Sequence, residues 1–180
     1  MHTFALKVKR IGILSDTHGH WDAHFAAHFA QCDEIWHAGD IGSMEVAERL
    51  ATLGTLRAVH GNIDGGELRS LFPEKYRFRC EGVDVLIKHI GGHPGHYHPS
   101  VREQLLRHPP SIFVCGHSHI LRVEYDETLK MLHINPGAAG LAGWQQVRTL
   151  VRLTINDTRI SDLEVIELGD KTSQFDRTLT

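Results

Sequence analysis

The first half of the chain is built on the pattern of one stretch, VKRIGILSDTH at residues 8–18. Val8–Leu14 has the length and apolar character of a buried strand and is interrupted only by Lys9 and Arg10. The residues that follow, Ser15–Gly19, are small or polar and favour a loop. We therefore predict a strand whose C-terminal end presents a carboxylate and an imidazole close together.

Downstream of this stretch, helical and strand patterns alternate up to about residue 66. The expected elements are a helix over Trp21–Gln31, a strand over Glu34–Ala38, a helix over Met44–Leu53 and a strand over Leu56–His60. A strand–helix–strand–helix–strand order is typical of a parallel sheet with right-handed crossovers. We therefore predict an α/β fold for the first half.

The second half of the chain consists mostly of strand patterns. The expected strands cover Tyr76–Cys80, Val83–Ile90, Ser111–Cys115, Leu121–Tyr125, Met131–Ile134, Val147–Ile155 and Ile160–Ile166, with a helix over Pro99–Arg107. The first two strands flank Glu81-Gly82 and predict a hairpin. This order predicts a largely antiparallel continuation of the structure.

Composition limits the class of protein. The 180 residues are 41% hydrophobic and 23% charged and carry a net charge of −3, so neither nucleic acid nor an anionic membrane is implied as a partner. We see no membrane-spanning stretch and expect no signal peptide. Three scattered cysteines predict reduced thiols and a cytoplasmic location. With no linker evident, we expect a single domain over residues 1–170 and a flexible tail over 171–180.

Polar residues with metal-binding side chains follow the predicted strands. They are Asp16, His18, Asp40, Asn62, His89, His117 and His119. Because the carboxyl ends of parallel strands meet at one edge of a sheet, we expect these side chains to converge. Imidazole and carboxylate groups without thiolate suit a divalent ion such as Mn, Fe or Zn. Seven ligands exceed the needs of one ion with open positions, whereas two ions sharing a carboxylate would use them all.

Each of these motifs has an ordinary structural explanation when it is taken alone. Asp and His are common at strand ends and helix caps, and Gly-Asp or Gly-Asn-x-Asp is most often a turn. Gly-His-x-His is stronger, because alternate residues of an extended segment point to one side, but a solvated loop is a fair alternative. Their order, each after a separate apolar strand, favours a common site.

In this order the motifs resemble the calcineurin-like metallophosphoesterase superfamily, and within it the small YfcE-like phosphodiesterases. The matching motifs are Asp16-x-His18, Gly39-Asp40, Gly61-Asn62, His89 and Gly116-His117-x-His119, and the match covers roughly residues 10 to 140. The resemblance implies a two-sheet β-sandwich flanked by helices, a four-layer αββα fold with a parallel N-terminal half and a more antiparallel C-terminal half. Asn135-Pro136-Gly137 looks like a structural turn of this family.

The resemblance also implies a ligand set and an activity. One ion would bind Asp16, His18 and His119, the second would bind Asn62, His89 and His117, and Asp40 would bridge the two. The expected function is that of a divalent-metal-dependent phosphoesterase, a phosphodiesterase rather than a monoesterase, in which a metal-bridging hydroxide attacks a small-molecule phosphoester in line. Asp40 and Asn62 would be catalytic. Mn is the favoured metal, with Fe, Zn, Ni or Mg as alternatives.

One position departs from the family pattern. Many members have a histidine after the Gly-Asn asparagine, where this chain has Ile63. We therefore expect either a preference for acidic leaving groups or a proton donor from elsewhere. His93, in the Gly- and His-rich segment 91–98, is our candidate, and a solvated loop is the alternative reading. His20 lies near the site, whereas His24 and His28 suggest a polar helix face.

Two other functions are compatible with the same sequence. The first is a protein-interaction scaffold of this fold with weak or no catalysis, and the second is a metal-binding regulatory protein. Intact ligand positions favour the enzyme, because function depends on the site and not on the fold. A homodimer or higher homo-oligomer is compatible with the later strands, which supply a sheet edge.

Overall fold

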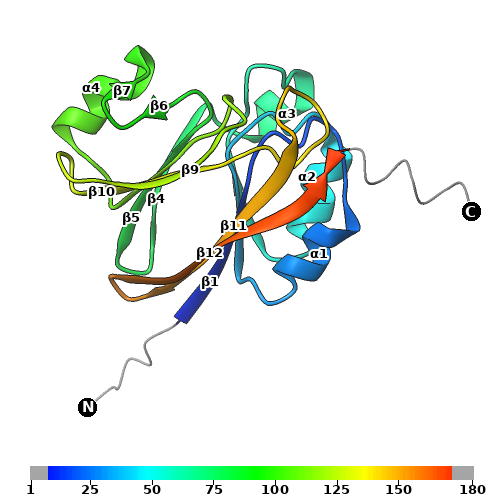
Figure 1. Ribbon diagram of the computed structural model, residues 1–180, viewed down its shortest axis with the longest axis horizontal. Helices are drawn as coiled ribbons and strands as arrows, with labels where there is room; N and C mark the ends of the chain where they lie inside the picture. Colours follow the sequence, from blue (N-terminus) through cyan, green and yellow to red (C-terminus); the bar gives the residue numbers. More distant parts are fainter. Residues whose placement is uncertain (1–7, 172–180) are drawn as a thin grey trace, which may run out of the picture.

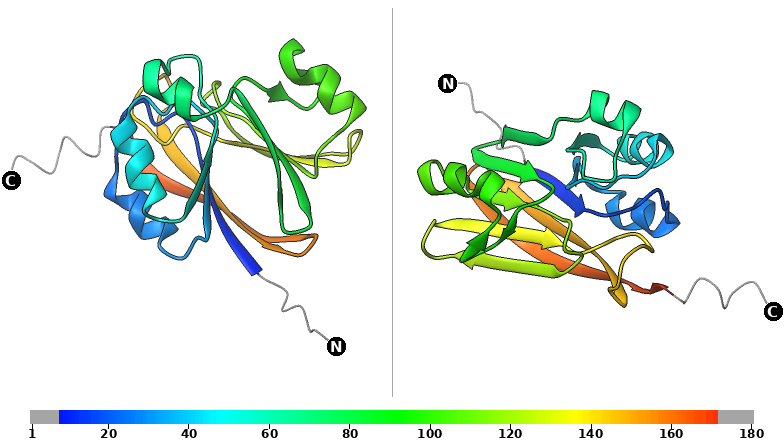
Figure 2. Two further views of the ribbon diagram at one scale, coloured as in Figure 1. Left: turned by 180° about the vertical axis from the view of Figure 1, so that it is seen from behind. Right: turned by 90° about the horizontal axis from the view of Figure 1, so that it is seen from above.

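The computed structural model describes residues 8–171, which fold into four layers (Figure 1). Two five-stranded sheets pack face to face. Three helices cover the outer face of the first sheet, and one helix lies on the outer face of the second. Figure 2 shows the same layers from behind and from above. The predicted αββα architecture is confirmed. Residues 172–180 of the expected tail lie outside the described residues.

The first sheet has the strand order β12-β11-β1-β2-β3. Its strands are β1 (Val8–Leu14), β2 (Glu34–His37), β3 (Thr55–Ala58), β11 (Val147–Asn156) and β12 (Arg159–Asp170). Strands β1, β2 and β3 are parallel, as predicted, and β11 joins β1 in antiparallel register. The C-terminal ends of the three parallel strands therefore meet at one edge.

The second sheet has the strand order β4-β5-β8-β10-β9. Its strands are β4 (Lys75–Cys80), β5 (Val83–Lys88), β8 (Ile112–Val114), β9 (Leu121–Asp126) and β10 (Met131–Pro136). The β4–β5 hairpin was expected, but β8 runs parallel to both β5 and β10, so this sheet is mixed and not purely antiparallel. The parallel pairing gives β5 and β8 C-terminal ends at the same edge.

The helices differ more from expectation than the strands. They are α1 (Ala23–Phe29), α2 (Met44–Ala51), α3 (Gly66–Leu71) and α4 (Pro99–Arg107). The predicted bounds of α4 are confirmed, α1 and α2 are shorter than predicted, and α3 was not predicted. Two short strands, β6 (Gly92–His93) and β7 (His96–Tyr97), pair within the Gly- and His-rich segment. No helix among residues 8–171 combines the length and apolarity needed to cross a bilayer.

Successive side chains of β1 point to opposite faces of the first sheet and so enter two different hydrophobic layers. Ile11 and Ile13 are fully buried between the sheets, and Leu14 packs with the helical layer. Gly12 faces that layer too, where a Cβ atom would lie 2.6 Å from the ring of Phe29. The missing side chain is what allows α1 to lie against the sheet.

We expect Gly12→Ala to destabilise the protein by about 1–3 kcal/mol, because the added methyl group would overpack the Phe29 contact. Urea unfolding followed by circular dichroism would measure the change. Gly65→Ala is a matched control, since no atom lies within 4 Å of a Cβ at that position; its cost as a helix N-cap change should stay below about 1 kcal/mol. Equal stability of the Gly12 variant and wild type would contradict this account of the packing.

Candidate metal centre

All seven predicted ligands lie beyond the C-terminal ends of strands, and both sheets contribute. Asp16 and His18 follow β1, Asp40 follows β2, Asn62 follows β3, His89 follows β5, and His117 and His119 follow β8. Their side chains fall into two adjoining groups at the shared edge of the sandwich. The structure therefore brings together every residue that the motifs singled out.

The first group consists of Asp16, His18 and His119, whose candidate ligand atoms all lie within 4.8 Å of one another. His119 Nε2 is 3.2 Å from Asp16 Oδ1, and His18 Nε2 is 3.9 Å from the same oxygen. Asp16 is fully buried, whereas the two imidazoles are only partly covered. The three side chains therefore surround a position that is partly accessible to solvent.

The second group consists of Asp40, His89 and His117, with Asn62 in contact. His89 Nε2 lies 3.3 Å from Asp40 Oδ1 and 3.0 Å from Asn62 Oδ1. His117 Nδ1 lies 2.9 Å from the same amide oxygen. Four side chains from four different loops thus direct nitrogen or oxygen atoms at one point.

Asp40 lies between the two groups. Its Oδ2 is 3.6 Å from His18 Nε2 in the first group, while its Oδ1 faces His89 in the second. Oδ1 also accepts a hydrogen bond from the backbone N–H of Ile63, at 3.0 Å. One carboxylate therefore contacts ring nitrogens of both groups.

The chemistry of the first group fits a cation. Asp16 Oδ1 and His18 Nε2 are buried atoms that make no hydrogen bond of normal geometry within residues 8–171. A buried carboxylate oxygen without a donor is costly. A divalent ion coordinated by Asp16, His18 and His119 would satisfy both atoms, and the mixed oxygen and nitrogen donors suit such an ion.

Two histidines are oriented by hydrogen bonds on the far side of the ring. His89 Nδ1 donates to the carbonyl of Ala38 at 2.8 Å, and His119 Nδ1 donates to Gln145 Oε1 at 2.8 Å. Each bond leaves the Nε2 atom directed at the carboxylates, the arrangement that commonly supports metal-ligating histidines. Gln145 carried no motif signal in the sequence, and its role depends on the loop before β11.

The electrostatics of the two groups are coupled. Burial opposes protonation of His89, but Asp40 and Asp16 outweigh it and raise the pKa of this imidazole. Asp16 likewise raises the pKa of His119. Burial alone would raise the pKa of Asp40, yet hydrogen bonding to His89 brings it below its usual value. The carboxylates thus attract positive charge, which a metal ion would supply more strongly than imidazolium.

The backbone is strained where the site is assembled. Five of the seven residues adopt the left-handed conformation: Asp16 (φ 54°), His18 (47°), Asp40 (53°), His117 (67°) and His119 (59°). Each such residue costs about 1–2 kcal/mol. Strain of this kind persists only where the surroundings impose it, and it concentrates at functional sites.

Asp64 holds two of the loops together. Its buried carboxylate accepts hydrogen bonds from the backbone N–H groups of Ile41, Gly42 and Gly61 at 2.8–3.1 Å. Gly61 must be glycine, because a Cβ there would lie 2.0 Å from Asp40 Oδ1. The sequence suggested a turn with Asn62 as a ligand for Gly-Asn-x-Asp and gave no role to Asp64, whose carboxylate positions the Asp40 loop.

Other histidines have clear structural partners. His37, fully buried, accepts from Gly39 N–H and bonds Thr17 Oγ1, and burial lowers its pKa to about 4. His24 bonds Asp22, the N-cap of α1. Asn135 and Pro136, expected in a turn, end strand β10 instead, but Asn135 is structural as expected, since its side chain donates to Gly116 O and Ser118 Oγ. These contacts brace the loops behind the seven residues.

The Gly- and His-rich segment is anchored on the second sheet. Tyr97 Oη donates to Asp126 at 2.7 Å, and His133 Nε2 donates to Gly92 O at 3.1 Å. His93 is half-buried, with Nδ1 bonded to Pro94 O. His98 is exposed, as the sequence suggested, and it also caps α4 by accepting from Ser100 N–H. Hydrogen bonds to the second sheet and the pairing of β6 with β7 therefore hold this segment in place.

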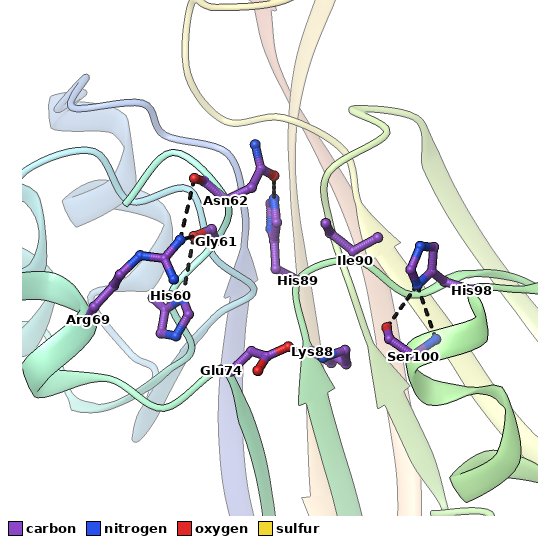
Figure 3. Close-up of a pocket in the computed structure, with 10 residues that line it drawn as sticks. All are labelled: His60, Gly61, Asn62, Arg69, Glu74, Lys88, His89, Ile90, His98 and Ser100. Atoms are coloured by element: carbon purple, nitrogen blue, oxygen red, sulfur yellow. Dashed lines mark hydrogen bonds and ion pairs between the residues drawn. The ribbon is translucent and has the colours of Figure 1, made fainter. Parts of the chain in front are cut away.

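Two pockets adjoin the second group. One, of about 250 Å³, is lined by Asn62, His89 and the Lys88–Glu74 ion pair (Figure 3). The other, of about 360 Å³, is lined by His117 and His93. Ile90 and His98 border both pockets. The second group therefore lies where the two pockets meet.

The fold is that of the metallophosphoesterase family. The chain belongs to the calcineurin-like phosphoesterase superfamily, whose domain profile matches residues 10–158. It is 29% identical, over 88% of its length and 92% of the relative's, to a "Probable metallophosphoesterase" of Methanothermobacter thermautotrophicus.

Solved structures share the fold. An archaeal phosphodiesterase has a TM-score of 0.66 at 23% identity, covering 88% of this chain and 99% of the other. Vps29 of Entamoeba histolytica, solved with Zn²⁺, has a TM-score of 0.69 at 17% identity, covering 90% and 99%. A predicted phosphoesterase of Streptococcus pneumoniae has a TM-score of 0.64 at 19% identity, covering 91% of each chain. At these identities the structures establish the common fold.

We expect Asp64→Asn to lower the free energy of unfolding by about 1–3 kcal/mol, because one carboxylate oxygen that accepts backbone hydrogen bonds becomes an amide donor. Thermal or urea unfolding of the metal-free protein would measure this. Asp157→Asn is the control, since Asp157 lies in the exposed β11–β12 turn, where asparagine also tolerates positive φ. If both variants were as stable as wild type, Asp64 would not organise the loops.

Proposed function

We propose that this protein is a divalent-metal-dependent phosphodiesterase. The observation that supports the proposal most directly is the placement of Asp40, which contacts imidazoles of both groups and so is suited to bridge two ions. Membership of a phosphoesterase superfamily supports the reaction class. The archaeal phosphodiesterase of the same fold is compatible with the finer assignment.

The proposed ligands divide as the geometry suggests. Asp16, His18 and His119 would hold one ion, Asn62, His89 and His117 a second, and Asp40 would serve both. Bound there, divalent ions, Mn in the first instance, would acidify a coordinated water and offset negative charge on the phosphoryl oxygens. Fe, Zn, Ni and Mg are the alternatives. Asn62 would position the phosphoryl group through its place at the mouth of the first pocket.

The two pockets favour a diester over a monoester. A phosphodiester carries two ester groups, and the second group of ligands has a pocket on either side, separated by Ile90 and His98. A monoester would fill only one of them. Neither pocket is closed by a large insertion, which fits small substrates of varied shape.

Activity should depend on Asp40. Metal-stripped protein, resupplied with Mn²⁺, should hydrolyse bis(p-nitrophenyl) phosphate, and Asp40→Asn should reduce kcat by at least about a hundredfold, because a shared carboxylate would be lost from both ions. Asp157→Asn, beyond the N-terminal end of β1, is the matched control.

Two outcomes would contradict this proposal in whole or in part. Metal binding by wild-type protein without turnover of any phosphoester, across Mn, Fe, Zn, Ni and Mg, would contradict the enzyme and favour the scaffold or regulatory function. Retention of full activity by Asp40→Asn would leave an enzyme but remove the bridging role.

We further propose that His93 donates the proton to the leaving group, because Ile63 cannot and His93 lines a pocket with His117. In wild type, rates on aryl and alkyl diesters should then differ only moderately. His93→Asn should slow alkyl diesters by about 10²- to 10⁴-fold and aryl diesters far less. His108→Asn, at the far end of α4, is the control. An unchanged dependence on leaving-group pKa would show that His93 is not the acid.

A further inference from the structure

The pocket beside His117 is lined by an arginine and by no acidic residue. We call it the Arg122 pocket; it is lined by His93, His98, His117, Ser118, Arg122 and His133, among others. No Asp or Glu is among its lining residues. In the neighbouring pocket Glu74 lies 2.6 Å from Lys88 Nζ and neutralises it, and the guanidinium of Arg69 already donates to backbone carbonyl groups of residues 61–64 (Figure 3). The Arg122 pocket therefore has an excess of positive charge beside the proposed reaction centre.

Arg122 extends from the edge strand β9. The strand register places it opposite Asn135 of β10, whose side chain supports the Gly116–Ser118 loop. Its nearest acidic partner is Glu124, at 3.5 Å and half-exposed, which is too solvated to hold the guanidinium firmly. The guanidinium therefore keeps donors available for a ligand in the pocket.

Ser118 provides a second donor. Its Oγ accepts hydrogen bonds from Ile120 N–H at 3.2 Å and from Asn135 Nδ2 at 3.0 Å. Both lone pairs of the hydroxyl are thereby occupied, so its proton is left to donate outward. A guanidinium and a donor-only hydroxyl in a pocket without carboxylates suit an anion, and Arg is well matched to the oxygens of phosphate.

We infer that Arg122 binds a phosphate group carried by one ester group of the substrate, so that the protein prefers phosphodiesters that bear a second, terminal phosphate. The inference rests on the proposed phosphodiesterase function. It assigns the other ester group, which need carry no charge, to the pocket lined by the Lys88–Glu74 pair. Arg122 is a specificity-determining residue in this scheme and takes no part in the chemical step.

The test compares two substrates that differ only in the terminal phosphate. A dinucleoside monophosphate and its 5′-phosphorylated form would be assayed with the Mn²⁺-loaded protein, alongside bis(p-nitrophenyl) phosphate. Wild type should favour the phosphorylated dinucleotide by about tenfold to a hundredfold in kcat/KM. Arg122→Leu should remove that preference through KM and leave the aryl diester within about twofold. Arg122→Lys should restore part of it.

A second measurement does not depend on turnover. Titration calorimetry of metal-free protein should give weaker binding of the phosphorylated dinucleotide to Arg122→Leu than to wild type. Arg102→Leu, an exposed arginine on α4 outside the Arg122 pocket, is the matched control and should match wild type in both assays.

The outcomes separate the inference from the function on which it rests. If wild type hydrolyses the aryl diester but Arg122→Leu affects both dinucleotides equally, or neither, the inference is wrong and the phosphodiesterase stands. If wild type hydrolyses no phosphodiester with any of the five metals, the proposed function fails and the inference falls with it.

Discussion

Two buried carboxylates at one edge of the sandwich impose the main constraint on this structure. Asp16 and Asp40 both lie close to His18 and His89, and no Lys or Arg forms an ion pair with either carboxylate within residues 8–171. Burying two negative charges that have imidazoles as their only cationic partners among residues 8–171 is costly. The same edge also holds five residues in the strained left-handed conformation. Bound cations would offset both the buried charge and the strain.

The sandwich makes such a site possible because parallel strands from both sheets end at the same edge. Strands β1, β2 and β3 supply loops from one sheet, and β5 and β8 supply loops from the other. The two sheets are locked by a shared apolar layer, so the loops have a rigid base. Backbone hydrogen bonds then link the loops directly, as from Asp16 N–H to Gly39 O and from His18 N–H to Asp40 O.

The sequence predicted those features that are encoded locally. The strand pattern of β1, the bounds of α4 and the polar residues at strand ends all follow from short-range periodicity and motif order. The parallel pairing of β8, the short helix α3 and the part played by Asp64 were not predictable in this way. They depend on contacts between residues distant in the chain, and Asp64 acts on backbone N–H groups, which no side-chain pattern reveals. The ligand roles of the seven residues remain a prediction that the geometry supports.

Substrate choice must come from outside the motifs. The seven residues recur as a set in the family resemblance, so they cannot distinguish one phosphoester from another. The pocket beside His117 is walled largely by the 91–98 segment, the loop after β8 and Arg122 of β9. The other pocket is walled by the loop after β3, Arg69 of α3 and the end of β5, together with His98 and Ser100. Tyr97 and His133 anchor that segment, which keeps His93 and His98 in place beside the strained loops. Reaction type and substrate preference therefore meet at the same edge, where wall residues that are not ligands can change without replacing a ligand.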